Sequence, residues 1–90
     1  MKRYQMIVEG RVQGVGFRGF VQMNAMKLNL TGTVRNMLNG MVEIFVQGEE
    51  ERIMLFMKEI KKGNMFIIVE EITSKEVPVV ADEKKFRALY

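Results

Sequence analysis

The 90-residue sequence contains no cysteine, no histidine and no tryptophan, and it has a single proline. Without cysteine there can be no disulfide framework, no thiolate zinc site and no cysteine nucleophile. Without histidine, the commonest general base and metal ligand is also missing. Any catalysis must therefore use arginine, lysine, asparagine, carboxylate, hydroxyl or backbone groups.

Long apolar runs are also missing. No stretch approaches the ~20 residues that span a bilayer, and the first nine residues lack the apolar core of a signal peptide. We therefore expect a cytoplasmic monomer that does not bind membranes. The length predicts a single domain over residues 1–90, and a composition of 48% hydrophobic and 28% charged residues is typical of a globular one.

The net charge of +3 comes from basic residues that are spread along the chain, so we expect no nucleic-acid partner. The nine methionines are many for this length. Because methionine fills irregular gaps in hydrophobic cores, we expect them to serve in packing.

The spacing of apolar residues predicts two amphipathic helices, over 17–28 and 49–62, and five strands, over 4–9, 33–37, 41–47, 66–72 and 86–90. Asn29 suits the left-handed end of the first helix, Asn39-Gly40 is a strong hairpin signal, and Pro78 breaks the fourth strand. The order is βαββαβ with a short C-terminal fifth strand. Two helices cannot cover both faces of such a sheet, so both should pack on one face. This predicts an α+β fold, a ferredoxin-like α/β sandwich whose mixed sheet is mostly antiparallel.

A glycine-rich loop joins the first strand to the first helix, and residues 10–19 read GRVQGVGFRG. Such a loop can turn backbone N–H groups toward one point, where the helix start adds partial positive charge. Arg18 adds a planar and permanently charged clamp. The pattern predicts a phosphoryl-binding site. The alternative that the loop alone leaves open is a simple connecting turn, with Arg18 solvated or paired to a surface carboxylate.

Three familiar phosphate motifs do not fit the sequence. Residues 14–19 match G-x-G-x-x-G, but 90 residues cannot hold a doubly wound sheet, and Arg35 and Asn36 stand where a dinucleotide site needs an acidic residue. The phosphatases that use a cysteine six positions before the arginine are excluded, because that position is Val12. No Gly-Lys-Ser/Thr follows the loop, which excludes a Walker-type P-loop.

Asn36 is a second candidate. It stands near the end of the second predicted strand, on the same side as Val34 by alternation, and a polar amide on the apolar side of a strand needs a hydrogen-bond partner. It is either a turn-forming residue before the hairpin or an amide that holds a water molecule or a phosphate oxygen.

Two sequence blocks, VEGRVQGVGFR over 8–18 and GTVRN over 32–36 followed by GMVE over 40–43, closely resemble the acylphosphatase family. The closing FRALY over 86–90 also looks like the family's last strand, so the resemblance covers essentially the whole chain. Departures are Asn64 after Gly63, where the family usually has proline, and Ala88 at an aliphatic position. The resemblance implies hydrolysis of small acyl phosphates to a carboxylate and inorganic phosphate, with no metal or cofactor.

The resemblance also implies the roles of individual residues. Arg18 matches the phosphate-binding arginine, and Asn36 matches the asparagine that positions the attacking water. The phosphate cradle would consist of the backbone N–H groups of Gln13, Gly14, Val15, Gly16, Phe17 and Arg18. Because a carboxylate leaves without protonation, direct in-line attack by water needs only positioning and charge stabilisation.

Two other functions remain open at this point. One is a non-catalytic binding module like an RNA-recognition fold, which would present aromatic residues such as Phe45 and Tyr4 on its open sheet face. The other is a domain of a larger machine, as in the hydrogenase maturation proteins that handle carbamoyl phosphate.

Overall fold

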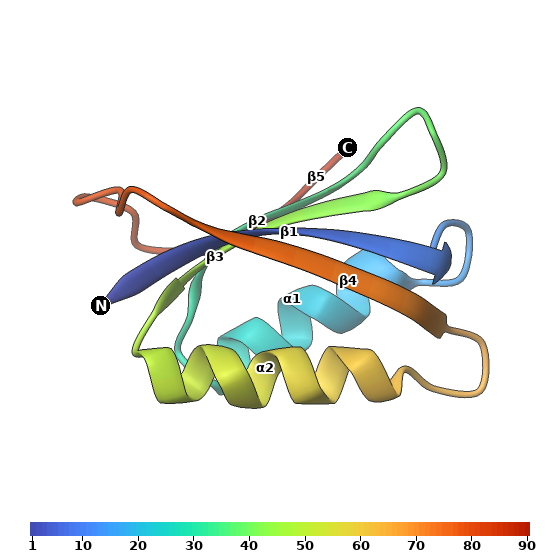
Figure 1. Cartoon of the computed structure of the whole chain (residues 1–90), viewed down its shortest axis with the longest axis horizontal. Coiled ribbons are helices and arrows are strands. Elements are labelled where there is room, and N and C mark those ends of the chain that lie inside the picture. Colours follow the sequence, from blue (N-terminus) through green and yellow to red (C-terminus); the bar gives the residue numbers. More distant parts are fainter.

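The chain forms one five-stranded sheet with both helices packed on the same face (Figure 1). The computed structural model describes residues 1–90. Its elements, in chain order, are β1 (Lys2–Arg11), α1 (Phe17–Lys27), β2 (Thr31–Asn36), β3 (Val42–Gly48), α2 (Glu50–Lys62), β4 (Ile68–Val77) and β5 (Phe86–Leu89). The α+β, ferredoxin-like fold class predicted from the sequence is confirmed.

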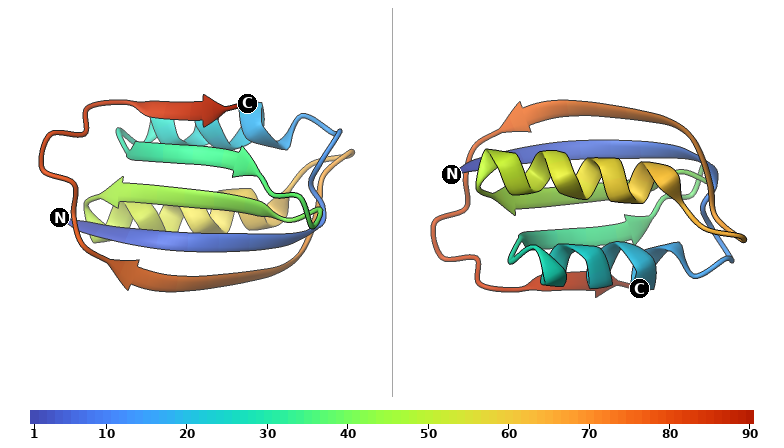
Figure 2. Two further views of the ribbon diagram at one scale, coloured as in Figure 1. Left: turned by 90° about the horizontal axis from the view of Figure 1, so that it is seen from above. Right: turned by 90° about the horizontal axis from the view of Figure 1, so that it is seen from below.

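The strands lie in the order β4-β1-β3-β2-β5 (Figure 2). β2 and β5 run parallel and the other neighbours run antiparallel. Because one face is covered by helices and the other meets solvent, apolar and polar residues alternate along β1 and β3. The most deeply buried side chains include Met6, Val8, Phe17, Val21, Val34, Ile44, Phe56 and Ile60.

The loop signals of the sequence act largely as expected. Asn29 follows α1 with a φ of 55°, in the left-handed conformation. β2 and β3 form an antiparallel hairpin with a connection over 37–41, in which a backbone bond between Met37 and Met41 closes a loop over 38–40. Gly40 has a φ of 89°, and the Met37 N–H donates to the carbonyl of Met41 at 2.8 Å. This is a three-residue hairpin loop that ends in a left-handed glycine.

The predicted bounds of the fourth strand are wrong at both ends. β4 begins at Ile68, because the side-chain oxygen of Asn64 accepts the N–H groups of Phe66 at 2.8 Å and Ile67 at 2.9 Å and holds them in a turn. It continues to Val77, just before the proline. Residues 73–76 pair with β1 but form the edge of the sheet, so they are polar and exposed and carry no apolar pattern.

The expectation that the methionines pack in the core is wrong for most of them. Met6 is fully buried, whereas five of the nine lie with half or more of their surface exposed. These are Met1, Met23, Met26, Met54 and Met65.

Neither α1 nor α2 has the length and apolar character that a membrane-spanning helix needs.

The open sheet face does not present the aromatic residues that an RNA-recognition domain would need. Tyr4 points to the helix side, where its hydroxyl donates to Glu50 Oε2 at 3.0 Å. The ring of Phe45 lies beneath the guanidinium of Arg3, 5.2 Å from the ring centroid. Neither ring is free to stack on a base.

Arg3 also fastens the segment between β4 and β5 to the sheet. Its Nη1 donates to Glu83 Oε1 at 2.8 Å, and both side chains are largely buried. The same carboxylate oxygen accepts the hydroxyl of Thr31 at 2.8 Å. Gln47 accepts the Val80 N–H at 2.8 Å and donates to the Val80 carbonyl at 2.9 Å. These contacts hold the segment between β4 and β5 against the sheet, so that the chain enters β5 beside β2.

Candidate active site

The loop between β1 and α1 has a backbone shaped by two glycines. Gly14 has a φ of 74° and Gly16 a φ of 80°, a region that other residues occupy only with strain. Gly16 directly precedes α1, and no side chain caps the helix or places an acidic group in its first turn. The first N–H groups of α1 therefore keep their partial positive charge available to an anion.

Arg18 lies in the first turn of α1 and is held from the far end of the chain. Its Nη1 donates to the carbonyl of Leu89 at 3.1 Å. Its guanidinium lies 4.2 Å from the centroid of the Tyr90 ring. These two contacts orient a long, mobile side chain beside the helix N-terminus, close to where the C-terminal end of the chain lies (Figure 2).

Gln13 ties the same loop to the β2–β3 hairpin. Its Nε2 donates to the carbonyls of Met37 and Met41, each at 2.8 Å. Met37 directly follows Asn36, the last residue of β2. The glycine loop and the end of β2 are therefore held in one fixed relation by a single side chain.

Asn36 lies opposite the buried Val42, on the helix side of the sheet as alternation predicted. Its Oδ1 is the one buried side-chain N or O atom in the structure without a hydrogen-bond partner. An orphaned buried acceptor is costly unless a ligand or water molecule satisfies it. The atom therefore marks a site where a donor is expected to bind.

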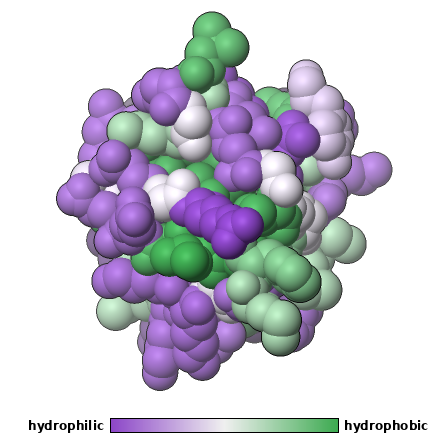
Figure 3. Space-filling view, turned by 90° about the vertical axis from the view of Figure 1, so that its right-hand side faces the viewer, coloured by the Kyte–Doolittle hydropathy of each residue, from purple (hydrophilic) through white to green (hydrophobic).

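These elements surround a small cavity of about 160 Å³. Its lining residues are Val12, Gly14, Gly16, Phe17, Arg18, Gly19, Asn36 and Tyr90. Figure 3 faces this end of the molecule, where a strongly hydrophilic side chain lies across hydrophobic surface. The cavity brings together the two halves that the sequence assigned separately, the glycine loop with Arg18 and the strand end with Asn36.

Two of the predicted loop residues do not line the cavity. Gln13 directs its side chain to the hairpin carbonyls, and Val15 packs partly against the hydrophobic core. Tyr90 lines it without having been singled out for the site. Arg18 and Tyr90 are too far apart in the sequence for local spacing to reveal their contact. The only available signal was the aromatic residue at the end of the closing FRALY pattern.

The charge around the cavity has one sign. Arg18 is the only residue in the lining with a charged side chain. No group of three or more His, Cys, Asp or Glu side chains is placed to hold a metal ion. A helix N-terminus and one guanidinium favour binding of a compact anion.

Comparison with known proteins identifies the family of this chain. The acylphosphatase family model matches residues 4–88. The chain belongs to the acylphosphatase family. It is 54% identical to an acylphosphatase of Clostridium beijerinckii over 90 residues, covering 100% of both chains. The crystal structure of the acylphosphatase from Bacillus subtilis superposes with a TM-score of 0.94 at 42% identity, again covering 100% of both chains.

The chain is also similar to part of a larger protein. The crystal structure of T. kodakarensis HypF matches with a TM-score of 0.88 at 36% identity, covering 100% of this chain and 12% of that one. The acylphosphatase fold thus also occurs within a much longer polypeptide. The resemblance to the acylphosphatase family noted in the two sequence blocks is confirmed.

Proposed function

We propose that this chain hydrolyses the carboxyl–phosphate bond of acyl phosphates by direct in-line attack of water, releasing a carboxylate and inorganic phosphate. The observation that carries the mechanism is the unpaired, buried Oδ1 of Asn36 in the cavity that Arg18 lines. Family membership supports the reaction class.

The phosphoryl group would bind between Arg18 and the start of α1. The guanidinium can donate to two of its oxygens in one plane, and loop N–H groups can donate to the others. These donors are fixed before substrate arrives, because Leu89 and Tyr90 hold the arginine and Gln13 holds the loop. Preorganised donors stabilise the charge on the equatorial oxygens in the transition state.

Asn36 would position the nucleophile. Its Oδ1 can accept one hydrogen of a water molecule and so turn the oxygen lone pair toward phosphorus. As the new P–O bond forms, the P–O bond to the acyl group breaks and its electron pair leaves on the carboxylate. A carboxylate needs no proton in order to depart, so no general acid is required. The proton of the water goes to a phosphoryl oxygen.

The cavity selects for the phosphoryl group more than for the acyl group. At about 160 Å³ it is smaller than the ~300–1,000 Å³ of pockets that enclose a drug-sized ligand. The acyl part would therefore remain outside, so the cavity itself does not select among acyl groups.

Steady-state hydrolysis of benzoyl phosphate tests the roles of Arg18 and Asn36. We expect Arg18→Ala to weaken phosphate inhibition and to raise the barrier by about 2.7–4 kcal/mol or more, which is about 10²–10³ in kcat. Arg11→Ala is the matched control, since Arg11 is exposed at the end of β1 and does not line the cavity. It should keep wild-type kinetics.

Asn36→Ala should lower kcat about 100-fold while the inhibition constant for inorganic phosphate stays nearly unchanged, because only the water loses its partner. Asn39→Ala, in the exposed hairpin loop, is the control. A wild-type kcat for Asn36→Ala would show that the water-positioning role is wrong.

We also expect full activity in excess chelator. Inhibition by chelator that added Mg²⁺ reverses would contradict a mechanism that uses only Arg18, Asn36 and backbone groups.

A further inference from the structure

The acyl group of the substrate needs a surface outside the phosphoryl cavity, whose volume is only about 160 Å³. Of the 8 residues that line this cavity, the exposed ones are Gly14, Gly16, Gly19 and Tyr90. All of these except Tyr90 lack a side chain. The acyl group can therefore cross the rim of the cavity at a glycine without displacing a side chain.

A shallow hollow of about 470 Å³, here termed the α1 hollow, adjoins the cavity on the outer surface of α1. Its lining residues are Gly19, Gln22, Met23, Met26 and Lys27, which recur at the spacing of one helix face. Gly19 lines both the hollow and the cavity, and a Cβ atom placed there would meet no heavy atom within 4 Å. The two spaces are therefore continuous over Gly19.

The α1 hollow offers apolar surface that no other part of the chain covers. Met23 is 53% exposed and Met26 is 62% exposed, and both lie on the same face of α1. Single exposed apolar residues are common on protein surfaces, but neighbouring ones beside a binding cavity form a patch. Methionine side chains are flexible and adapt to ligands of different shape. The aliphatic part of Lys27 can extend this patch.

The geometry of in-line displacement directs the acyl group toward this hollow. The departing group must lie on the side of the phosphorus atom opposite to the attacking water. Asn36, which would hold that water, belongs to the sheet, whereas Gly19 belongs to the helix layer (Figure 1). A water molecule held from the sheet therefore directs the acyl group toward the helix layer, where the α1 hollow begins.

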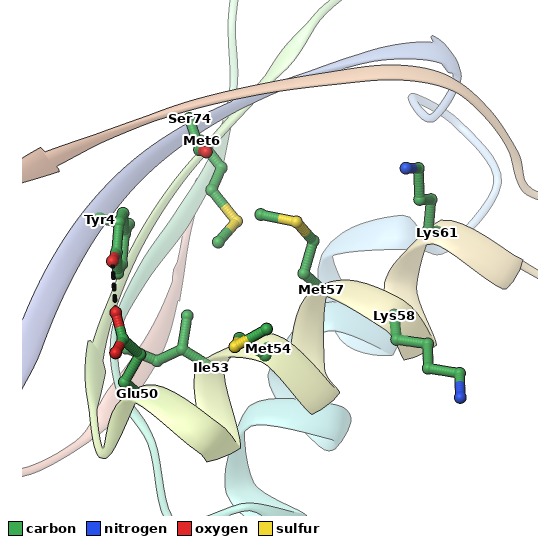
Figure 4. Close-up of a pocket in the computed structure, with 9 residues that line it drawn as sticks. All are labelled: Tyr4, Met6, Glu50, Ile53, Met54, Met57, Lys58, Lys61 and Ser74. Carbon is green, nitrogen blue, oxygen red and sulfur yellow. Dashed lines mark hydrogen bonds between the residues drawn. The ribbon is translucent and has the colours of Figure 1, made fainter.

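A second apolar groove, of about 500 Å³, lies between β4 and α2 (Figure 4). Met54 and Met57 line it from α2, and Ser74 lines it from β4. It shares no lining residue with the phosphoryl cavity. α2 lies over the half of the sheet that contains β3 and β4, whereas α1 lies over the half with β2 and β5 (Figure 2). An acyl chain whose phosphoryl group is bound in the cavity therefore meets the α1 hollow and not this groove.

We propose that the α1 hollow binds the acyl chain of the substrate, so that the enzyme prefers acyl phosphates with an unbranched aliphatic chain. This inference rests on the proposed hydrolysis and adds a substrate class to it. Gly19 and Met23 lie one helical turn apart, which is about 6 Å along the helix axis. An acetyl group is too short to cover this distance, whereas a hexanoyl chain can reach Met23.

The preference should appear as a dependence of kcat/KM on chain length. A fully buried methylene group strengthens binding about fourfold, and a shallow hollow that covers one side of the chain should supply about half of that free energy, or about twofold per methylene. The chain makes the same contacts before and during P–O cleavage, so the effect should lie in KM, with kcat nearly constant. Saturated straight-chain carboxylates have nearly equal basicity, so the leaving group stays comparable along the series.

Steady-state hydrolysis of acetyl, butyryl and hexanoyl phosphate tests this binding mode. For the wild type we expect kcat/KM to rise about tenfold from acetyl to hexanoyl phosphate. In the double variant Met23→Gln/Met26→Gln this ratio should fall to about threefold or less, because glutamine keeps the length and helix preference of methionine but is polar. Met54→Gln is the matched control, since Met54 is a 67% exposed methionine of α2 in the separate groove. It should keep the wild-type ratio.

The acetyl phosphate rate separates this inference from the function on which it rests. If neither acetyl nor benzoyl phosphate is hydrolysed, the proposed hydrolysis is wrong and the acyl-chain site is wrong with it. If the wild type hydrolyses all three substrates with equal kcat/KM, the hydrolysis stands and the acyl-chain site is overturned. An equal fall in the ratio for the double variant and for Met54→Gln would also overturn it. Urea denaturation of each variant checks that the protein is folded under the assay conditions.

Discussion

Replacing Gln13 by methionine tests whether one side chain holds the two halves of the site in register. The change keeps the length of the side chain and removes both donors to the carbonyls of Met37 and Met41. Each carbonyl keeps a backbone donor, from Gly40 at 3.2 Å and from Met37 at 2.8 Å respectively, so neither is orphaned.

The expected loss is therefore that of two ordinary hydrogen bonds without an additional desolvation penalty. At about 0.5–1.5 kcal/mol each, this is about 1–3 kcal/mol of unfolding free energy, with a lower Tm as the readout. We expect kcat to fall about tenfold, because the glycine loop and the water-positioning amide lose their fixed relation.

Urea denaturation and benzoyl phosphate kinetics at 25 °C, where the variant stays folded, separate the two effects. Gln22→Met is the matched control, since Gln22 donates to the carbonyl of Phe86 at 3.2 Å away from the cavity. It should lose some stability and keep wild-type kcat. If Gln13→Met also kept wild-type kcat per folded molecule, Gln13 would serve stability alone and the positioning argument would fail.

Three further predictions concern stability. Glu83→Gln removes the carboxylate that pairs with the largely buried Arg3, so the unfolding free energy should fall by about 2–3 kcal/mol, and an unchanged urea midpoint would contradict this. Gly16→Ala should cost about 1–2 kcal/mol because of its φ of 80°, whereas Gly19→Ala, the same change inside α1, should add up to about 1 kcal/mol; equal shifts in Tm would refute the backbone argument. Because the pKa of Glu9 is raised above its ordinary 4.5, the folded state binds this proton more tightly, and stability is lost as pH rises through that raised pKa. Glu9→Gln should therefore have a higher Tm than the wild type at pH 7, and the difference in Tm should become smaller toward pH 4. A difference in Tm that grows toward pH 4 would show that the ionised Glu9 carboxylate does not destabilise the fold.

Much of the fold could be predicted because the local signals and the burial agree. The apolar alternation of β3, the left-handed Asn29 and the Asn39-Gly40 hairpin each act within a few residues. The end of β4 could not be predicted in the same way. Residues 73–76 are polar because they form a solvent-exposed edge, and their strand conformation comes from pairing with β1, about 70 residues earlier in the chain.

The candidate site also has a part that local sequence patterns predict and a part that depends on distant contacts. Arg18 and Asn36 stood out because glycine spacing and strand alternation are local properties of the sequence. The side-chain bonds of Gln13 reach 24 and 28 residues along the chain, and that of Arg18 reaches 71. Contacts of this kind depend on strand order, which decides which distant segments become neighbours.

The bond between Arg18 and the carbonyl of Leu89 also bears on how the protein is made. Arg18 is synthesised early, but its carbonyl and aromatic partners are in the last strand and beyond it. β1 likewise waits for β3 and β4, between which it lies. A chain still emerging from the ribosome can form α1 and the β2–β3 hairpin, yet its arginine has no orienting contact until β5 docks beside β2. Hydrolytic activity should therefore be absent from ribosome-bound chains stalled before β5 and should arise only after it has left the exit tunnel.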